Sequence, residues 1–352
     1  MNVYLLDSQF NIIDIIDQYV SLIWTTRYFK RGDFELMVKA SKKMVKKLQL
    51  GRYLVREKDI DGTAKKNVMV IQNIQIQTDV ESGDNLIVSG YDLKDIVHRR
   101  VIPLQTMYIR DRIDEVVKAL IDHNITYAET GRNIPTFSFR YTVGSDLVTI
   151  QVTGDNLGDY IEELLEKYGY GYEVSTSGIY MHFELRQGQD HSLGTSNPVI
   201  FSESFDNLLS TDYTLDTREY ANVAYVGGEG EGSDRKIIST GSGTGIDRRE
   251  IFVDARDISS NDGEISTENY NSMLATRGQE ALTEHSTTTL FDGNVNNTVN
   301  YKLGVDYNIG DIVQVVTSYG ISLPARITEI IESDDVNGSL ILPTFSYEGG
   351  EE

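Results

Sequence analysis

The sequence of 352 residues contains no cysteine. This absence excludes a disulfide framework, zinc held by cysteine and catalysis by a thiol, and it fits synthesis in a reducing cytosol. The N-terminal stretch MNVYLLDSQFNIID has no basic region ahead of an apolar core, so it does not predict a signal peptide. No apolar run approaches the ~20 residues that a membrane-spanning helix needs, and we expect no membrane span.

Positive charge is also scarce. The 32 Lys and Arg residues stand against 54 Asp and Glu residues, which gives a formal net charge of −22. Because contacts of Lys and Arg with phosphates supply much of the affinity for DNA, such a surface repels nucleic acid and anionic lipid. We therefore expect no tight nucleic-acid binding, although DNA could pass along this surface without being retained.

Residue patterns that support catalysis are missing as well. The histidines do not form H-E-x-x-H or another zinc pair, and they are His98, His123, His182, His191 and His285. The segment GSGTG (241–245) lacks the central serine of a hydrolase elbow. Glu162 and Glu163 are adjacent on a predicted helix, so their side chains point apart and do not bracket a sugar bond. The sequence predicts no enzyme, no cofactor and no metal site.

Glycine is concentrated in the stretch AYVGGEGEGSDR (224–235). A dinucleotide fingerprint is excluded because Ser233 stands where its third glycine is needed, and no Gly-Lys-Ser/Thr follows as in a P-loop. The carboxylates of Glu229 and Glu231 would also repel a phosphate. Since glycine tolerates positive φ, we interpret the stretch as a flexible hinge, formed by Gly227, Gly228, Gly230 and Gly232.

The segment DISSNDGEISTE (257–268) comes nearest to a metal site. Positions one, three, five and twelve of a calcium loop are filled by Asp257, Ser259, Asn261 and Glu268. The required glycine falls one place late, at Gly263, and the preceding IFVDAR is strand-like rather than helical. We interpret the segment as a capped turn that leads into a helix, and the sequence leaves open whether a weakly held cation lies there.

The alternation of apolar and polar residues predicts a β-rich α+β chain of several domains. Short strands between Asp and Gly turns in 1–100 favour a first small β-barrel. An α/β domain is predicted over 101–195. A second, discontinuous β-barrel is predicted from 196–226 plus 286–352, and a small domain with one helix is inserted between its two parts at 227–285.

Three longer helices are predicted from apolar residues at helical spacing. RIDEVVKALI (112–121) has Asp111 at a plausible N-cap position. A second helix runs from Leu157 to Tyr168 and has Gly169 as its C-terminal stop. The third is expected from near Thr267 to about Glu284.

Two parts of the chain follow the same order of strands and turns. LGRYLVR (50–56), VMVIQNIQI (68–76) and SGDNLIVSGYD (82–92) correspond to IGDIVQV (309–315), PARITEIIE (324–332) and VNGSLILPTFSY (336–347). Each set gives a strand led by glycine, a strand with buried isoleucine, an acidic turn and a closing strand. We interpret the two sets as an internal pseudo-repeat, in which the two predicted barrels are related.

A series of segments runs in order along the whole chain. It begins with LIVSGYDLKDIVHRRVI (86–102) and YVGGEGEGSDR, and continues with RREIFVDARDIS (248–259), LATRGQEALTEH (274–285), YNIGDIVQV (307–315), ARITEIIES (325–333) and PTFSY (343–347). This series resembles the siphophage tail-hub family of baseplate hub or tail-associated, Gp37-like proteins. None of the segments is a catalytic signature, so the resemblance concerns a fold and a place in a tail.

The resemblance implies a structural hub at the distal end of the tail tube, located at the tail tip of the virion after synthesis and assembly in the host cytoplasm. It implies a homotrimer whose partners are a distal tail or tube protein, a tape-measure protein, and a tail fibre or receptor-binding protein. Three copies of a chain with two barrels present six similar units, so we expect the hub to convert sixfold tube symmetry to threefold tip symmetry around a DNA exit conduit.

Two other functions stay open. One is a tail-tip cell-wall hydrolase, which needs a convergent pair of acids or a metal set in a cleft. The other is a carbohydrate-binding host-recognition module, which the 21 tyrosines leave possible although barrel and interface tyrosines are commoner. Many tail-associated proteins carry a further host-binding or lytic extension, whereas this sequence stops at Glu352 just after the last predicted strand. We therefore expect those roles to belong to other proteins.

Overall fold

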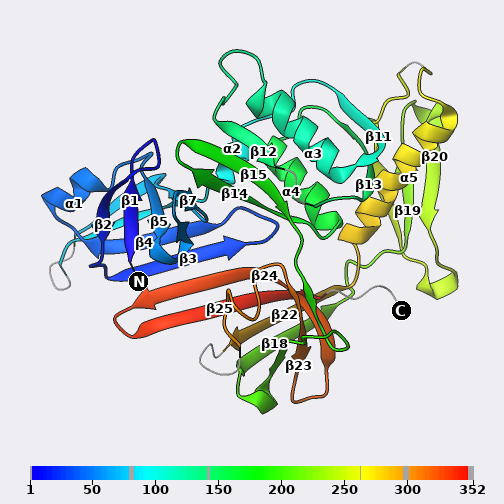
Figure 1. The fold of residues 1–352 in the computed structure, drawn as a ribbon. Coiled ribbons are helices and arrows are strands. Elements are labelled where there is room, and N and C mark those ends of the chain that lie inside the picture. Colours follow the sequence, from blue (N-terminus) through cyan, green and yellow to red (C-terminus); the bar gives the residue numbers. More distant parts are fainter. Residues whose placement is uncertain (1, 79–82, 141–142, 262, 296–300, 348–352) are drawn as a thin grey trace.

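A computed structural model describes residues 2–78, 83–140, 143–261, 263–295 and 301–347. Within these residues strands predominate and form five sheets, while helices are few. The N-terminal sheets lie on one side, a helix-containing unit lies above the C-terminal strands, and a small unit with a long helix lies at the far side (Figure 1). The predicted β-rich α+β architecture is confirmed at this level.

A four-stranded sheet near the N-terminus has the strand order β2-β1-β5-β8. The turn between the first two strands forms because the carboxylate of Asp7 accepts hydrogen bonds from the backbone N–H groups of Gln9 (2.8 Å) and Asn11 (2.9 Å). The strands are β1 (Val3–Leu6), β2 (Ile12–Ile16), β5 (Tyr53–Arg56) and β8 (Met69–Val70). A short helix, α1 (Lys42–Lys47), precedes β5 and has Ser41 as its N-cap.

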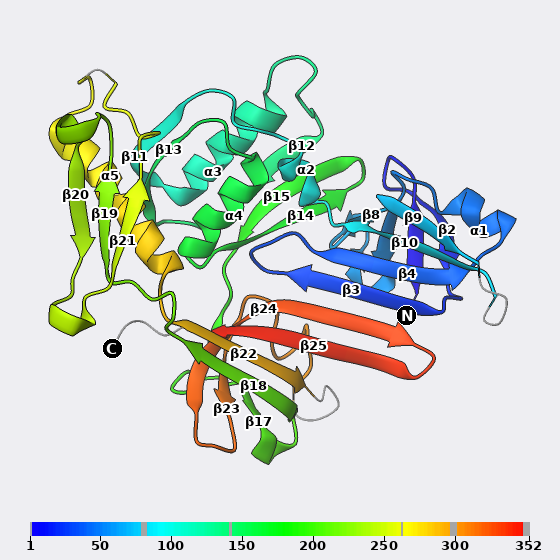
Figure 2. The ribbon, with the colours of Figure 1, turned by 180° about the vertical axis from the view of Figure 1, so that it is seen from behind.

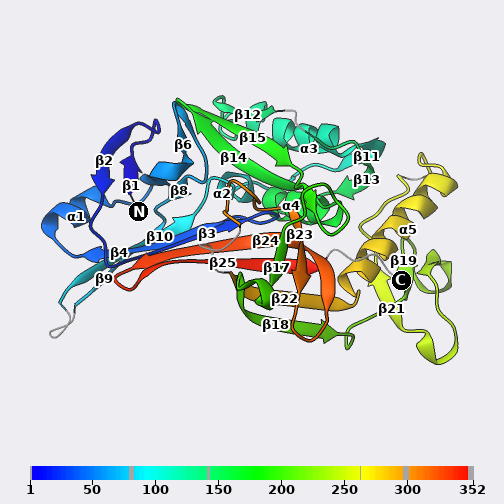
Figure 3. The same ribbon diagram turned by 60° about the horizontal axis from the view of Figure 1, so that its bottom comes forward.

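A larger sheet joins the two ends of the chain. Its strand order is β18-β22-β25-β24-β3-β4-β10-β9, and β23 lies off this path, paired with β24, β16 and β17. Figures 2 and 3 show the hairpin of β3 and β4 lying alongside β24 and β25. The strands are β3 (Ser21–Arg27), β4 (Asp33–Lys39), β9 (Asn73–Gln77), β10 (Asn85–Tyr91), β16 (Asp190–His191), β17 (Ile200–Ser202), β18 (Leu208–Asp216), β22 (Thr288–Val295), β23 (Ile312–Val316), β24 (Ser322–Asp335) and β25 (Gly338–Tyr347).

Two separate hydrophobic cores form against this sheet. Trp24, Phe34 and Leu36 are buried with residues of the four-stranded sheet. Phe201 and Phe345 belong to a second core under the C-terminal strands. Because each core is closed by its own strands, the large sheet connects two packed β-units.

The α/β unit is built on a five-stranded sheet of order β12-β15-β14-β7-β6 and a two-stranded sheet of β11 and β13. Its strands are β6 (Ile60–Asp61), β7 (Ala64–Lys65), β11 (Thr106–Arg112), β12 (Phe137–Arg140), β13 (Leu147–Val152), β14 (Gly171–Ser177) and β15 (Tyr180–Arg186). Its helices are α2 (Asp95–His98), α3 (Ile113–Ile121) and α4 (Leu157–Lys167).

The predicted helices of this unit are present. The apolar faces of α3 and α4 are buried in one core, as helical spacing predicts. Gly169 has a φ of 71° just after α4, which confirms it as the helix stop. The prediction that Asp111 is the N-cap of α3 was wrong. Strand β11 extends through Arg112 by pairing with β13, so Arg112 occupies the N-cap position.

The small unit consists of a three-stranded sheet of order β20-β19-β21, with α5 packed on it. Its elements are β19 (Val223–Gly227), β20 (Ile237–Gly241), β21 (Glu250–Asp254) and α5 (Thr267–Glu284). The predicted bounds of the helix are confirmed. Gly278 lets α5 approach closely, because a Cβ at this position would lie 2.6 Å from Cγ2 of Val226.

None of the sheets closes into a barrel in the part of the chain that the structure describes. The closed barrels predicted for 1–100 and for 196–226 plus 286–352 are therefore not confirmed; these segments form open, packed sheets. The division into four domains stays a prediction.

The two segments that follow the same order in the sequence have the same hydrogen-bond register. The N–H of Gly51 donates to the carbonyl of Ile71, and the N–H of Gly310 donates to that of Ile327, both at 2.8 Å. Both glycines have positive φ, 77° and 91°. The following strand pairs also agree: β5 pairs with β8 and β23 with β24 through corresponding residues, and the next strand returns antiparallel in both sets.

Candidate functional site

The two β-units meet at an antiparallel junction between β3 and β24. Seven residue pairs run from Arg27 opposite Glu329 to Ser21 opposite Asp335. At one end Nε of Arg27 donates to Glu329 at 2.5 Å, and its Nη1 donates to Asp33 at 2.5 Å. Backbone pairing supplies direction and register, so the two units are held in one orientation.

A buried ion cluster lies behind this junction. Arg56 of β5 is 1% exposed, donates to Glu332 of β24 at 2.6 Å and to Asp59 at 2.5 Å, and stacks 4.8 Å from the ring centre of Trp24. Lys58 also pairs with Glu332. Burial alone would raise the pKa of Glu332, but Arg56 and Lys58 hold it below its ordinary value. The buried ion pair between Arg56 and Glu332 therefore holds β5 against β24.

A second buried polar group connects the first β-unit to the α/β unit. Lys94 is 5% exposed, and its Nζ donates to the carbonyls of Arg27 (2.7 Å) and Lys30 (3.0 Å) while lying 4.5 Å from the ring of Tyr172. Asp92 accepts from the N–H groups of Gly32 (2.9 Å) and Lys94 (3.1 Å). Burial raises the pKa of Asp92 to about 6 and lowers that of Lys94. These side chains hold the loop after β3 in place.

His98, Asp159 and Glu162 form the one group of potential metal ligands found in the described residues. The Nδ1 atom of His98 lies 3.0 Å from Asp159, and its Nε2 atom lies 2.9 Å from Glu162. The two nitrogens of one imidazole point in opposite directions, so these contacts bridge the carboxylates through the ring and do not converge on one ion. The group therefore acts as a polar clamp between α2 and α4.

The glycines predicted as a hinge lie inside the small unit: Gly227 is the last residue of β19, and Gly228, Gly230 and Gly232 follow it in the connection to β20. Gly227 and Gly228 are buried, and the guanidinium of Arg235 donates to their carbonyls at 2.8 and 3.2 Å. Gly230 and Gly232 have positive φ of 96° and 55°. The chain passes between β18 and the small unit at 217–222 and returns at 285–287. A flexible role for these glycines stays a prediction.

The residues of the candidate calcium loop do not gather around one point. Asp257 forms an ion pair with Arg277 at 2.8 Å. The hydroxyl of Ser259 donates to Glu229 at 2.6 Å, while Glu268 lies in the first turn of α5. Asn261 has a φ of 51°, as expected for a turn.

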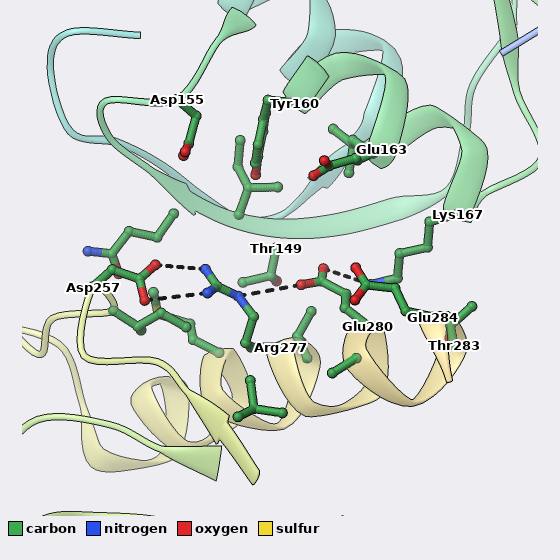
Figure 4. A pocket seen from close by; sticks show the side chains of 18 of the residues that line it. Thr149, Asp155, Tyr160, Glu163, Lys167, Asp257, Arg277, Glu280, Thr283 and Glu284 are labelled. Carbon is green, nitrogen blue, oxygen red and sulfur yellow. Dashed lines mark hydrogen bonds and ion pairs between the residues drawn. The ribbon is translucent and has the colours of Figure 1, made fainter. Parts of the chain in front are cut away.

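A cleft of about 1000 Å³ lies between α4 and α5. Figure 4 shows Asp155, Tyr160 and Glu163 on one side and Arg277 between Asp257 and Glu280 on the other. Lys167 pairs with Glu280 at 2.8 Å. Partial burial, followed by the nearby Glu284, raises the pKa of Glu163. The acidic residues of this cleft come nearest to the convergent pair of acids that a hydrolase would need. Two of them, Asp257 and Glu280, form ion pairs with Arg277 and Lys167.

The ion cluster of Arg56 and the Asp92–Lys94 group were not identified from the sequence. Both were visible only as charged residues directly beside apolar runs, in YLVREKD and LIVSGYDLKD. That signal is weak because strand ends commonly carry charges on the surface.

Comparison with known proteins places this architecture. Among solved structures, a tail protein from Neisseria meningitidis MC58 has a TM-score of 0.62 at 12% identity, covering 99% of this chain and 96% of that one. The 43 kDa tail protein of prophage MuSo2 from Shewanella oneidensis has a TM-score of 0.63 at 14% identity, with coverage of 99% and 98%. Prophage tail protein gp18 from Listeria monocytogenes EGD-e has a TM-score of 0.55 at 12% identity, with coverage of 99% and 96%.

A search of curated proteins found no match to this chain. In the described ranges, no helix is both long and apolar enough to cross a membrane. Residues 2–346 match the family described as siphovirus ReqiPepy6 Gp37-like protein. The chain belongs to this siphovirus tail protein family, as the sequence resemblance predicted.

Proposed function

We propose that this tail protein is the baseplate hub at the distal end of the tail tube. Three copies would close the tube, convert its sixfold symmetry to the threefold symmetry of the tip, and surround the DNA exit conduit. Its partners would be a distal tail or tube protein, the tape-measure protein, and a tail fibre or receptor-binding protein. The tail family and the tail-protein fold support a place in the virion tail.

The corresponding hydrogen-bond registers support two related β-units in each chain. Gly51 and Gly310 each lie two residues before corresponding strands, donate the corresponding backbone hydrogen bond and have positive φ. Independent strands have no reason to share both the register and a positive-φ glycine at the same turn position. This agreement supports two related β-units in one chain, and three such chains would present six similar units to a sixfold tube.

The junction of β3 and β24 supports the same arrangement. A ring of alternating units needs a fixed angle between the two units of each chain. Backbone pairing over seven residues and the buried Arg56–Glu332 contact would hold that angle. The α/β unit and the small unit would then lie outside or distal to the ring.

The conduit is supported by charge. With a net charge of −22, the protein has few sites at which phosphates could be retained. DNA would then pass without binding.

A cell-wall hydrolase is the alternative that the acidic cleft keeps open. We expect purified protein incubated with host cell walls to release no muropeptides, because Asp257 and Glu280 are held in ion pairs. Glu163→Gln is the matched variant, since Glu163 faces the cleft and its pKa is raised. Muropeptide release that disappears in Glu163→Gln would overturn the structural proposal.

A further inference from the structure

The cleft between α4 and α5 has a rim of acids. Seven of the residues that line it are acids and two are bases. Both bases are already engaged, because Lys167 pairs with Glu280 and Arg277 with Asp257. Within the part of the chain that the structure describes, four other carboxylates at the cleft are exposed and form no ion pair: Asp155, Glu163, Glu166 and Glu284. The cleft therefore presents an excess of negative charge to a molecule that enters it.

These carboxylates repel one another. The pKa of Glu163 is raised first by partial burial and then by Glu284, Asp159, Asp155 and Glu280. All four of these neighbours are acids. A positive charge placed among them would relieve the repulsion.

The arrangement does not suit a single metal ion. A metal ion needs several ligand atoms that converge on one point. Among the described residues, His98, Asp159 and Glu162 form the one group of potential ligands that are close enough, and their contacts run through the imidazole ring. The free carboxylates are instead spread along two facing helices, as Figure 4 shows for Glu163 and Glu284. They suit a ligand with several positive charges along its length.

The floor of the cleft is apolar, and one polar group in its wall has no partner. Leu164, Ile258 and Met273 line the cleft and are buried. Gln151 also lines it; both polar atoms of its amide are buried, and neither has a hydrogen-bond partner in the described ranges. Leaving a buried amide unpaired is costly. Because an amide both donates and accepts, the backbone of an extended peptide would supply the missing hydrogen bonds.

We propose that this cleft binds a basic segment of another tail protein, an extended peptide whose lysine or arginine side chains reach the carboxylates at the rim. At about 1000 Å³ the cleft is large enough for a segment of several residues. The aliphatic stems of lysine side chains can lie along the apolar floor while their charged ends stay at the rim. A polyamine would also neutralise the rim, but its protonated amines only donate, so the amide nitrogen of Gln151 would stay unpaired.

The bound segment would contact α4 of the α/β unit and α5 of the small unit at the same time. It would therefore hold these two units together, in addition to the ion pair of Lys167 with Glu280. Binding at the cleft goes beyond the proposed hub and does not depend on it, because the number of copies in the ring is measured separately.

Fluorescence anisotropy with a labelled peptide of alternating lysine and valine measures the binding, at about 0.15 M salt to screen non-specific attraction. Glu163→Gln/Glu284→Gln removes two charges from the rim and should unfold in urea no more easily than wild type, since it relieves repulsion. Glu129→Gln/Glu231→Gln removes two charges from exposed acids outside the cleft, so the two variants have the same net charge. We expect the rim variant to bind the peptide at least about fivefold more weakly than wild type, and the control to stay within about twofold.

Gln151→Met tests the amide. Methionine has a similar length and no strong hydrogen-bonding group, so the fold should be retained. We expect the peptide to bind at least about threefold more weakly, while the weaker binding of spermidine is unchanged.

Each outcome decides the occupant of the cleft. Equal losses of peptide binding in the rim variant and its control would overturn the site, because they would show a general attraction to an acidic protein. Peptide binding that Gln151→Met leaves unchanged, or spermidine binding as tight as that of the peptide, would assign the cleft to a polyamine and overturn the peptide. Losses confined to Glu163→Gln/Glu284→Gln and Gln151→Met would support the peptide site, whatever the number of copies in the ring.

Discussion

At the scale of single residues, the protein buries charged side chains that hydrogen-bond to the backbone. Lys94 and Asp92 are buried in the loop between the first β-unit and the α/β unit, and each holds backbone groups of the other segment. A buried charge without partners would destabilise the fold by several kcal/mol. The loop and the two side chains therefore depend on one another.

Replacing Asp92 by Asn tests this dependence through pH. Asn can accept only one of the two backbone hydrogen bonds well, so we expect a loss of about 1–3 kcal/mol in unfolding free energy at pH 7.5. The folded-state pKa of Asp92 is raised from 3.8 to about 6, so its ionisation opposes folding above pH 6, and this cost is relieved as the pH falls from 6 to 4. The wild-type protein gains that stability and Asp92→Asn does not.

Urea denaturation at pH 7.5, 6 and 5 measures the unfolding free energy of the wild-type protein and of Asp92→Asn. The stability difference between wild type and Asp92→Asn should widen as the pH falls, and a difference that narrows would contradict the raised pKa. Groups common to both proteins cancel in this comparison.

At the scale of elements, helices marked by a local residue pattern could be predicted from the sequence, whereas strand pairings between distant segments could not. The bounds of α5 followed from helical spacing between Thr267 and Glu284, and Gly169 followed from the need for a left-handed C-cap. Asp111 was missed as a strand residue because its partner, Val148, lies far along the chain. The pairing of β3 with β24 could not be read either, since about 300 residues separate the strands and nothing local marks them as partners.

The proposed repeat is the exception, because glycine at a positive φ leaves a local signal in the sequence. Gly51 and Gly310 could be matched in the sequence, and the hydrogen bonds of their strands agree. Arg56 left no such signal: a charged residue at a strand end is usually exposed, whereas tertiary packing buries this one under Trp24 and Glu332. The candidate hinge and cation residues were found by composition, which does not reveal packing.

The contact between β5 and β24 makes an element-scale prediction. Arg56→Met leaves Glu332 buried with only the half-exposed Lys58, so we expect a loss of about 3–5 kcal/mol in unfolding free energy. Arg27→Met at the more exposed Glu329 pair should lose about 1 kcal/mol or less.

The double variant Arg56→Met/Glu332→Met separates charge from shape. It removes the unpaired carboxylate, so it should be more stable than Arg56→Met alone. Equal losses in Arg56→Met and Arg27→Met, measured by denaturant unfolding, would show that the buried cluster does not stabilise this junction.

At the scale of the whole molecule, two features of the chain belong together. The chain contains two β-units with corresponding strand registers, and its large sheet runs from one unit into the other through the pairing of β3 with β24. A single unit repeated six times would need no such internal junction. This arrangement is the ground for the proposed trimer, in which six similar β-units would face the tube.

A reconstruction of the assembled tail tests this claim most directly, by counting copies and β-units in the ring next to the tube. The account predicts three copies, with six similar β-units around the axis and a β3–β24 junction inside every chain. Six copies in the ring, or only one β-unit of each chain facing the tube, would contradict it.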